Sequence, residues 1–388
     1  MRRIAFAITV TCLCSQQLAH GQRGRITIQW PSSAFRSFQA LIDSAPNGAL
    51  IEIASGDLPM TPVVIYRKTL EFAGAGSGRQ PGTPVTRLIG QPPTPVLDEG
   101  GNLVLPAASI TGMFNLIGAT VVIRDLATQL SDAAVVIRDD ADGTSGATLI
   151  QDVVIAGAGR GINVLSSGPV IVEDVAIEKP LWHGISASPL TAGSVHLTDA
   201  IIVAPLCAGA FFENAAGFFD NVTITGASCG GIVGIRGTGA FITDSYLADN
   251  RLAGILLFET PGGFIDGNTI EHTVQGSINH PALKICVGVP DCGGDGIALV
   301  LSGHIDPIFM RANTIHNTAR GSVAIWGSTA ALEDNTMTCA AFDVNVEIFQ
   351  GVPFVVDDIA ANKCGCGGAL TSCVGISSNL VPPPTVPP

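Results

Sequence analysis

Two short phrases of the sequence resemble each other and end on ionisable residues. The first, "GNTIEH", spans residues 267–272, and the second, "ANTIHN", spans residues 312–317. The position that carries a carboxylate in the first phrase carries an imidazole in the second. Carboxylates, imidazoles and a guanidinium in one patch could supply a general base, a general acid and an anion-binding group. The candidate catalytic residues are Asp249, Arg251, Glu271, His272 and His316.

A second group of candidates, for binding, precedes two glycines. Arg160 and His183 each stand directly before a Gly, and Trp182 beside His183 is a candidate surface for stacking a sugar ring. Both groups also have a plain structural explanation. Polar residues are expected at any solvated turn, and a Trp at such a position is commonly a plug of the core. The sequence leaves both explanations open.

A repeat of about 23 residues would bring the first group together. The phrase "DVVI" at residue 152 recurs in related form at residues 174, 199, 221 and 244, in steps of 22, 25, 22 and 23 residues. Each period holds short β-branched runs separated by Gly, Asp or Asn, a pattern typical of strands and turns. No helical periodicity lies between the strands, so the repeat predicts coils of short parallel strands stacked about 4.8 Å apart. A glycine before an apolar run keeps the same period at Gly161, Gly184, Gly209, Gly231 and Gly254.

Stacking makes equal positions of the repeat into neighbours in space, and it predicts that the candidate catalytic residues share one edge. It also predicts that Cys207 and Cys229, one coil apart, come within disulfide reach. Asn268, Asn313 and Asn335 should share a corner, because Asn tolerates the left-handed conformation and can hydrogen-bond along a stack. The step of 45 residues between the first two Asn is about two periods. Either one coil is degenerate, or a coil carries a long loop across residues 277–295.

The start of the chain carries the most specific family resemblance. "AFRSFQALIDSAPNGALIEIASGDL" (34–58) is followed by "VVIYRKTLEFAGAGSG" (63–78) and "TRLIG" (86–90). With these segments the chain resembles the right-handed parallel β-helix proteins of the pectate-lyase-like superfamily. The resemblance implies an all-β fold, a single-stranded right-handed parallel β-helix (solenoid) with a short N-terminal capping helix. We expect Ser32 or Ser33 to cap that helix, and its apolar face to consist of Phe35, Phe38, Leu41 and Ile42.

The remaining segments follow from composition. Arg2 and Arg3, an apolar run and small residues before residue 22 are typical of a secretory signal peptide. No later run is long and apolar enough to span a membrane. After removal of the signal peptide we expect the protein to be secreted or periplasmic, or located in the cell envelope, and we expect a monomer. The predicted segments are a signal peptide at 1–21, an N-terminal cap at 22–46, the β-helix at 47–363 and a Cys/Gly/Pro-rich tail at 364–388.

Eight of the ten Cys follow residue 21, and an even number in an exported chain indicates disulfides. Cys286 and Cys292 could tie off the long loop, but the connectivity cannot be deduced from the sequence. Cys364-Gly-Cys366 lacks the second pair of ligands that a zinc site needs. We expect no cofactor. Ca²⁺ is the one metal to consider, because "RDDADGTS" (138–145) resembles half of a calcium-binding loop.

The charge of the chain restricts its partners. The formal net charge is −13, and no cluster of Lys and Arg occurs. Counterion release on a phosphate backbone needs such a cluster, so the sequence argues against nucleic-acid binding. The same field would repel a polyanionic substrate unless a cation such as Ca²⁺ bridged the two.

Two functions remain. The first is binding or processing of a polysaccharide, by a hydrolase- or lyase-type reaction, in a groove along the solenoid. The second is a non-catalytic secreted or surface solenoid with a binding or structural role. The motif sets of polygalacturonases, pectin methylesterases and pectate lyases are missing, and fold alone does not give function. The sequence therefore leaves open whether the chain is an enzyme, and also the glycan type and linkage.

Overall fold

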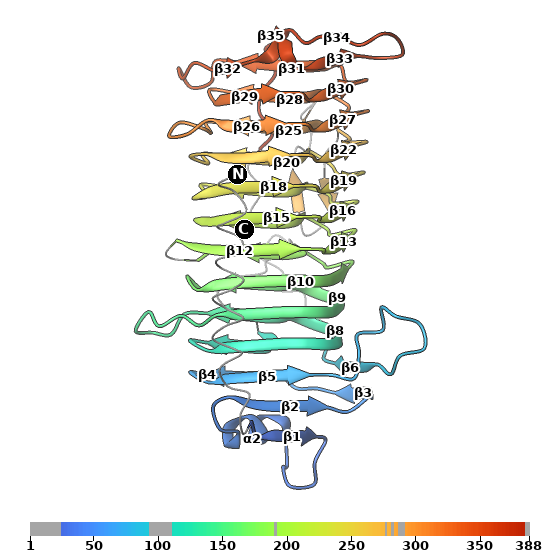
Figure 1. The fold of residues 1–388 in the computed structure, drawn as a ribbon, viewed down its shortest axis with the longest axis vertical. Coiled ribbons are helices and arrows are strands. Elements are labelled where there is room, and N and C mark those ends of the chain that lie inside the picture. The colour runs from blue at the N-terminus through green and yellow to red at the C-terminus, as the bar shows by residue number, and fades with distance from the viewer. Residues whose placement is uncertain are drawn as a thin grey trace.

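The computed structural model describes residues 25–92, 111–189, 192–275, 278–280, 283–285 and 292–384. They form a right-handed parallel β-helix of about 13 turns, which confirms the predicted fold. In Figure 1 the coils stack along the long axis, from α2 (Phe38–Ser44) and β1 (Thr27–Trp30) at one end to β35 (Gly375–Ile376) at the other. Each coil passes through three faces, which we number in chain order. The predicted signal peptide lies outside the described residues. No helix in the described ranges is long and apolar enough to cross a membrane.

Face 1 opens each coil, and its strands pair in parallel along the stack. Three long strands turn the corners and belong to more than one face: β8 (Thr120–Arg138), β9 (Thr148–Leu165) and β10 (Pro169–Glu178). The strands of face 1 alone are β1 (Thr27–Trp30), β2 (Ala49–Ile53), β5 (Thr69–Ala73), β12 (Gly193–Thr198), β15 (Ala215–Asp220), β18 (Gly239–Thr243), β21 (Gly263–Asp266), β26 (Ile308–Arg311), β29 (Thr329–Glu333) and β32 (Val355–Asp357).

Face 2 follows face 1 and consists of short strands, and face 3 closes the coil. The strands of face 2 are β3 (Gly56–Pro59), β6 (Thr86–Ile89), β13 (Ile201–Val203), β16 (Thr223–Thr225), β19 (Tyr246–Ala248), β22 (Thr269–Glu271), β27 (Thr314–His316), β30 (Thr336–Thr338) and β33 (Lys363–Gly365). Those of face 3 are β4 (Val63–Tyr66), β7 (Gly112–Ile117), β11 (Ile185–Ala187), β14 (Ala208–Glu213), β17 (Gly230–Ile235), β20 (Ala253–Phe258), β25 (Asp295–Val300), β28 (Gly321–Trp326), β31 (Phe342–Glu347) and β35 (Gly375–Ile376).

The main core is a continuous column, because inward-pointing residues from the strands of the three faces pack against one another along the stack. On face 2 the middle residue of each short strand is the inward one, and the residues on either side face outward. The inward column of face 2 is Ile177, Ile202, Ile224, Leu247, Ile270, Ile315 and Met337, each exposing 1% or less of its surface. The outward positions of the same strands are therefore free to carry functional side chains.

The repeated glycine before each run on face 3 has a steric cause. A Cβ added to Gly254 would lie 2.5 Å from Cγ2 of Ile270 and 2.7 Å from the carbonyl oxygen of Gly296. Gly184 would meet Cγ2 of Ile202 at 2.6 Å in the same way. The backbone of face 3 thus passes directly over the inward column of face 2, and only glycine permits this approach.

At the corner between faces 1 and 2, the repeated Asn residues hydrogen-bond along the stack as predicted, but they are not the residues in the left-handed conformation. Its left-handed residues are Asp152, Asp174, Asp199, Asn221 and Asp244, with φ between 48° and 54°. In the Asn phrases the left-handed residue likewise precedes the Asn, as at Ala312 (φ 52°) and Asp334 (φ 55°). The Asn side chains themselves point into the corner and are buried.

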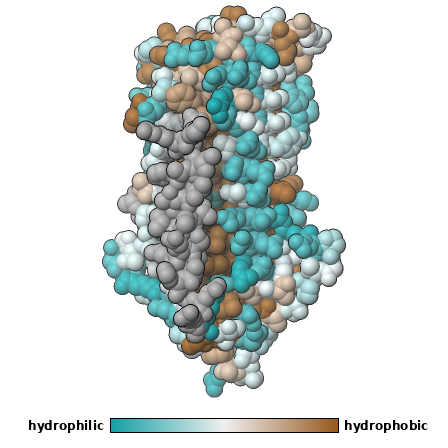
Figure 2. Space-filling view, in the orientation of Figure 1, coloured by the Kyte–Doolittle hydropathy of each residue, from teal (hydrophilic) through white to brown (hydrophobic). Residues whose placement is uncertain are grey.

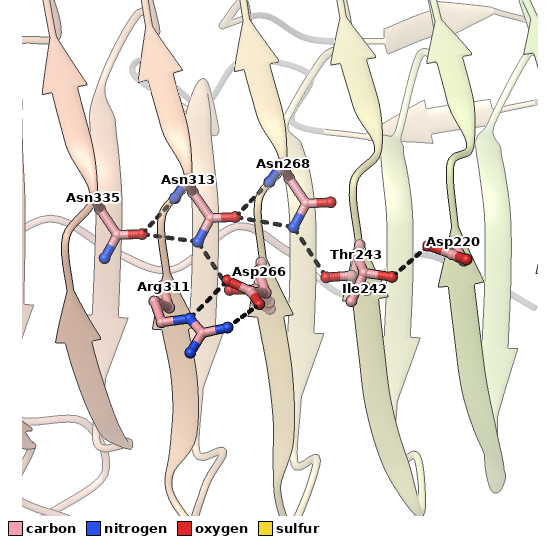
Figure 3. A network of polar contacts seen from close by, with 9 residues as sticks. Asp220, Ile242, Thr243, Asp266, Asn268, Arg311, Asn313 and Asn335 are labelled. Atoms are coloured by element: carbon pink, nitrogen blue, oxygen red, sulfur yellow. Dashed lines mark hydrogen bonds and ion pairs between the residues drawn. The ribbon is translucent and has the colours of Figure 1, made fainter. Parts of the chain in front are cut away.

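The buried Asn residues hydrogen-bond along the stack, as Figure 3 shows. The backbone N and Nδ2 of Asn268 donate to Oδ1 of Asn313 at 3.0 and 2.9 Å. Asn313 donates to Oδ1 of Asn335 at 3.0 and 2.8 Å, and Asn335 donates to Asn362 at 2.9 and 2.7 Å. Each amide therefore satisfies backbone and side-chain groups of the neighbouring coil. The lower coils fill this position with Val153, Val175, Ala200 and Val222 instead.

The capping helix starts later than predicted. Ser37, not Ser32 or Ser33, is the N-cap of α2, and its side-chain oxygen accepts from the backbone N of Ala40 at 3.1 Å. Phe35 consequently precedes the helix, while Phe38, Leu41 and Ile42 are buried against the end of the core. The actual cap lies directly before the apolar run, where the first-turn amides need an acceptor.

The 45-residue step is a loop and not a degenerate coil. β22 pairs with β27 and β20 pairs with β25, so the coils on either side of the step are direct neighbours. The intervening chain contains an antiparallel hairpin of β23 (Ile278–His280) and β24 (Leu283–Ile285). Cys286 lies outside the described residues, whereas Cys292 is disulfide-bonded.

Disulfides follow the stacking. Cys207 and Cys229 are bonded with a Cα–Cα distance of 4.6 Å, which confirms the predicted pair. At the end of the solenoid, Cys339 is bonded to Cys366 and Cys364 to Cys373. The second of these lies beside the short antiparallel pairing of β33 with β34 (Thr371–Ser372). A short 3₁₀ helix, η2 (Ile359–Ala361), precedes this region.

Candidate functional site

The candidate catalytic residues lie at the C-terminal ends of face 2 strands and in the turns that lead to face 3. Glu271 and His316 are register partners in β22 and β27. Asp249 and His272 occupy the left-handed turn position after β19 and β22, with φ of 55° and 52°. The backbone N of each donates to a carbonyl of the coil above, at 3.2 Å in both cases. These bonds fix the spacing of the side chains along the edge.

Glu271 forms the centre of the site. Its Oε2 lies 2.8 Å from Nε2 of His316, and its Oε1 accepts a hydrogen bond from the hydroxyl of Tyr246 in the coil below. The side chains of Glu271 and His316 expose 19% and 28% of their surface, so the pair is accessible to solvent from one side. The hydrogen bond to Glu271 raises the pKa of Tyr246 above its usual value, because it favours the protonated phenol.

His272 and Asp249 extend the site along the corner. Nδ1 of His272 lies 3.9 Å from Oδ1 of Asp249, and the two side chains are 52% and 71% exposed. Asn317 occupies the next turn position and lies with Nδ2 3.0 Å from Nδ1 of His316 and 3.4 Å from Nε2 of His272. We call Tyr246, Asp249, Glu271, His272, His316 and Asn317 the polar edge.

Arg251 is the outlying member of the predicted group. It lies two residues beyond Asp249, is exposed, and its backbone bridges to Val274. Its guanidinium forms no ion pair with any residue that the structure describes. It therefore flanks the polar edge as an available cation.

The structure places Arg160, Trp182 and His183 together, but inside the molecule. They expose 1%, 6% and 0% of their surface, and the ring of His183 stacks on Phe211 with 5.0 Å between centroids. Nη1 of Arg160 lies 3.2 Å from Oγ of Ser186. Burial lowers the pKa of the Arg160 guanidinium to about 10. No ring face of Trp182 is open for stacking a sugar, so its role as a core plug fits the structure better.

The half calcium loop is already neutralised by the protein. Arg67 forms ion pairs with both Asp140 and Asp142, and the hydroxyl of Tyr66 donates to Asp140 at 2.8 Å. The Arg67 guanidinium thus already pairs with the carboxylates that a Ca²⁺ ion would need. Across the described ranges, no three His, Cys, Asp or Glu side chains are grouped so as to hold a metal ion.

Tyr246 and Asn317 were missed as site residues by the sequence analysis. Tyr246 belongs to a column whose other members are mostly Thr, so no tyrosine recurs with the period that could have marked this position. Only the register, which pairs it with Thr269 two residues before Glu271, shows that the phenol reaches the carboxylate. A cavity of about 90 Å³ lies at the same corner in the first coils, lined partly by Met60, Met113 and Asp132, away from the polar edge.

Comparison with known proteins supports the fold class. The family model described as "Right handed beta helix region" matches residues 190–338, the stretch that holds the polar edge. Among solved structures, the catalytic unit of the thermostable GH87 alpha-1,3-glucanase from Streptomyces thermodiastaticus strain HF3-3 is similar, with 16% identity and a TM-score of 0.55. The alignment covers 88% of this chain and 69% of that one. Comparison with curated protein sequences gives no match.

Two further similar structures are named as epimerases of mannuronan and of alginate. The Azotobacter vinelandii mannuronan C-5 epimerase AlgE4 A-module has 15% identity and a TM-score of 0.53, over 88% of this chain and 94% of that one. The periplasmic alginate epimerase AlgG has 10% identity and a TM-score of 0.51, over 88% and 84%. The chain is a right-handed parallel β-helix protein. Identities this low define the fold and leave the activity to the chain's own residues.

Proposed function

We propose that this protein is exported and that it binds or processes a polysaccharide laid along face 2, across the polar edge. The observation that supports this most directly is the pairing of Glu271 with His316 at 2.8 Å, with Tyr246 and His272 beside it. Carboxylates, imidazoles and a phenol in one accessible row are the groups that proton transfer to and from a sugar requires.

The proposed roles follow from the contacts. The contact at 2.8 Å holds His316 beside the Glu271 carboxylate, where this pair could exchange a proton with the oxygen of a glycosidic bond. His272 is the better exposed imidazole, with Oδ1 of Asp249 3.9 Å from its Nδ1, and it is the proposed proton acceptor. Arg251 would stabilise negative charge that develops on a sugar oxygen during the reaction. Such a set supports either hydrolysis or β-elimination.

A non-catalytic role has one observation in its favour. Asp249 and His272 are 71% and 52% exposed, whereas acid–base catalysts gain most from a site that excludes water. A solenoid that only binds a glycan needs no such exclusion. The alternative is therefore a secreted or surface module whose polar edge contacts sugar hydroxyls.

The test is incubation of the purified protein with neutral and uronate glycans, with and without Ca²⁺, and detection of reducing ends or unsaturated products. We expect Glu271→Gln to lower turnover by at least about 100-fold, because general acid–base groups contribute about 10²–10⁴-fold. Glu333→Gln, an exposed acid on β29 of face 1, is the matched control and should keep full activity.

Binding without turnover that survives both Glu271→Gln and His272→Ala would establish the non-catalytic role. If no glycan in the panel were bound or converted, the proposal would fail.

A further inference from the structure

We propose that the polysaccharide accepted on face 2 is uncharged and not a polyuronate. This inference rests on the proposed function and names its ligand class. The similar solved structures include both an alpha-1,3-glucanase and mannuronan epimerases, so the fold alone does not decide between the two. The residues in the two outward columns of face 2 indicate which of the two kinds of glycan would bind.

The first outward column presents hydroxyl and apolar groups. Thr223 pairs with Tyr246, Tyr246 with Thr269, and the register continues through β27 and β30. All members face solvent at least in part, and the Tyr246 and Ile201 side chains are 38% and 40% exposed. The column from β13 to β30 is Ile201, Thr223, Tyr246, Thr269, Thr314 and Thr336.

The second outward column lies two residues further along each strand, and it includes the Glu271–His316 pair. Its members are Val203, Thr225, Ala248, Glu271, His316 and Thr338. Six coils at about 4.8 Å give a surface roughly 24 Å long. Over that length neither column contains a Lys or an Arg. The first column reaches a cation only at its far ends, at Arg87, which is paired with Asp57, and at Lys363.

Carboxylates border this surface mainly on one side. The corner before face 2 carries Asp174, Asp199, Asp244 and Asp334 as left-handed turn residues. The corner after it carries Asp249, and Lys179 and Arg251 are the cations nearby. The whole chain adds a net charge of −13.

A polyuronate brings one carboxylate per sugar, and each would need a cation along the path. Face 2 offers hydroxyls instead, which donate and accept hydrogen bonds with sugar hydroxyls, and the exposed Tyr246 ring, which packs on apolar sugar surface. Like charges facing each other across an interface oppose binding, most strongly at low ionic strength. Both arguments favour an uncharged chain.

The test compares binding of an uncharged glucan and of polymannuronate, each at low and at high ionic strength. We expect the glucan to bind with little dependence on salt and Tyr246→Ala to weaken it about tenfold. We expect polymannuronate to bind at least tenfold more weakly at low ionic strength, with the difference shrinking as salt is added.

A gain-of-binding variant sharpens the result. Thr223→Lys with Thr314→Lys places two cations on the face, so we expect polymannuronate binding to increase at least tenfold at low ionic strength. Thr198→Lys with Thr329→Lys, on face 1, is the matched control and should have no such effect.

Polymannuronate that binds the unaltered protein more tightly than glucan, most of all at low salt, would overturn the inference and leave the proposed function standing. Binding of neither polymer at either ionic strength would overturn this inference, whereas the proposed function fails only if no glycan of the wider panel is bound or converted.

Discussion

The residues of the polar edge lie close together because of the repeat, whereas the environment of each side chain depends on individual contacts that do not repeat. The adjacency of Glu271 and His316 could be predicted, because the period of the sequence makes equal positions into neighbours. The contact of Tyr246 with Glu271 could not, because it depends on a side chain that reaches across to a different position of the next coil. The burial of Arg160 and His183 was equally hidden, since the sequence does not tell which face of a strand is covered.

The two tyrosines of the chain give a residue-scale prediction. Tyr66 and Tyr246 each donate to a carboxylate, Asp140 and Glu271, and those hydrogen bonds raise the pKa of both phenols. Because the folded-state pKa is raised, these bonds contribute to stability below about pH 10 and the contribution is lost as the pH rises through the folded-state values. We expect Glu271→Gln to shift one phenolate transition in the ultraviolet absorbance toward lower pH.

The control is Asp140→Asn, which should shift the other transition and leave that of Tyr246 in place. Two unchanged transitions in Glu271→Gln would show that the Tyr246–Glu271 hydrogen bond does not form in solution.

At the scale of strands and turns, the sequence predicted well what sterics impose in every coil. Turn residues with positive φ, glycines before face 3 and the paired cysteines all recur with the period, and the structure confirms them. Where a segment occurs only once, a prediction was wrong or alternatives stayed open. The start of α2 at Phe38 depends on which of three nearby Ser residues caps it, and only Ser37 has its oxygen at the first turn. The loop after β22 was ambiguous because a length of two periods does not reveal pairing.

The glycine column gives a prediction at this scale. We expect Gly254→Ala to lower the free energy of unfolding by about 1–3 kcal/mol, because its Cβ would lie 2.5 Å from Ile270 in a filled core. Thermal or denaturant unfolding followed by circular dichroism would measure the change.

Gly368→Ala is the matched control, since its added Cβ would meet no atom within 4 Å and its φ is not positive. Equal stability of both variants would contradict the close approach of face 3 to the inward column of face 2.

At the scale of the whole molecule, the stack is closed at both ends by different means. α2 covers the first coils, and two disulfides with β33, β34 and β35 finish the last. The chain then returns along face 3, where Nε1 of Trp326 donates to the carbonyl of Leu380 and Nη1 of Arg320 to that of Val381, both at 2.9 Å. Arg320 also forms a buried ion pair with Asp295. Figure 2 shows a mostly hydrophilic surface with smaller apolar patches over the visible part of the stack.

Removal of the returning segment gives a whole-molecule prediction. Deleting residues 379–388 would uncover Trp326, now 1% exposed, and the Arg320–Asp295 pair. We expect a red shift of the tryptophan emission and a lower midpoint of thermal unfolding, because the deletion exposes the apolar Trp326 ring to water and removes the two hydrogen bonds to Leu380 and Val381.

Deleting only residues 385–388 keeps the two hydrogen bonds and should change neither signal. An unshifted emission spectrum after the longer deletion would mean that the segment does not cover Trp326 in solution.

The direct pairing of β20 with β25 has a further consequence. About twenty residues, between His272 and Asp295, leave the stack and rejoin it without changing which coil follows which. Evolution, or an engineer, can therefore replace that loop without changing the solenoid. A new selectivity would then be acquired by replacing one segment, with no need to redesign the scaffold that carries it.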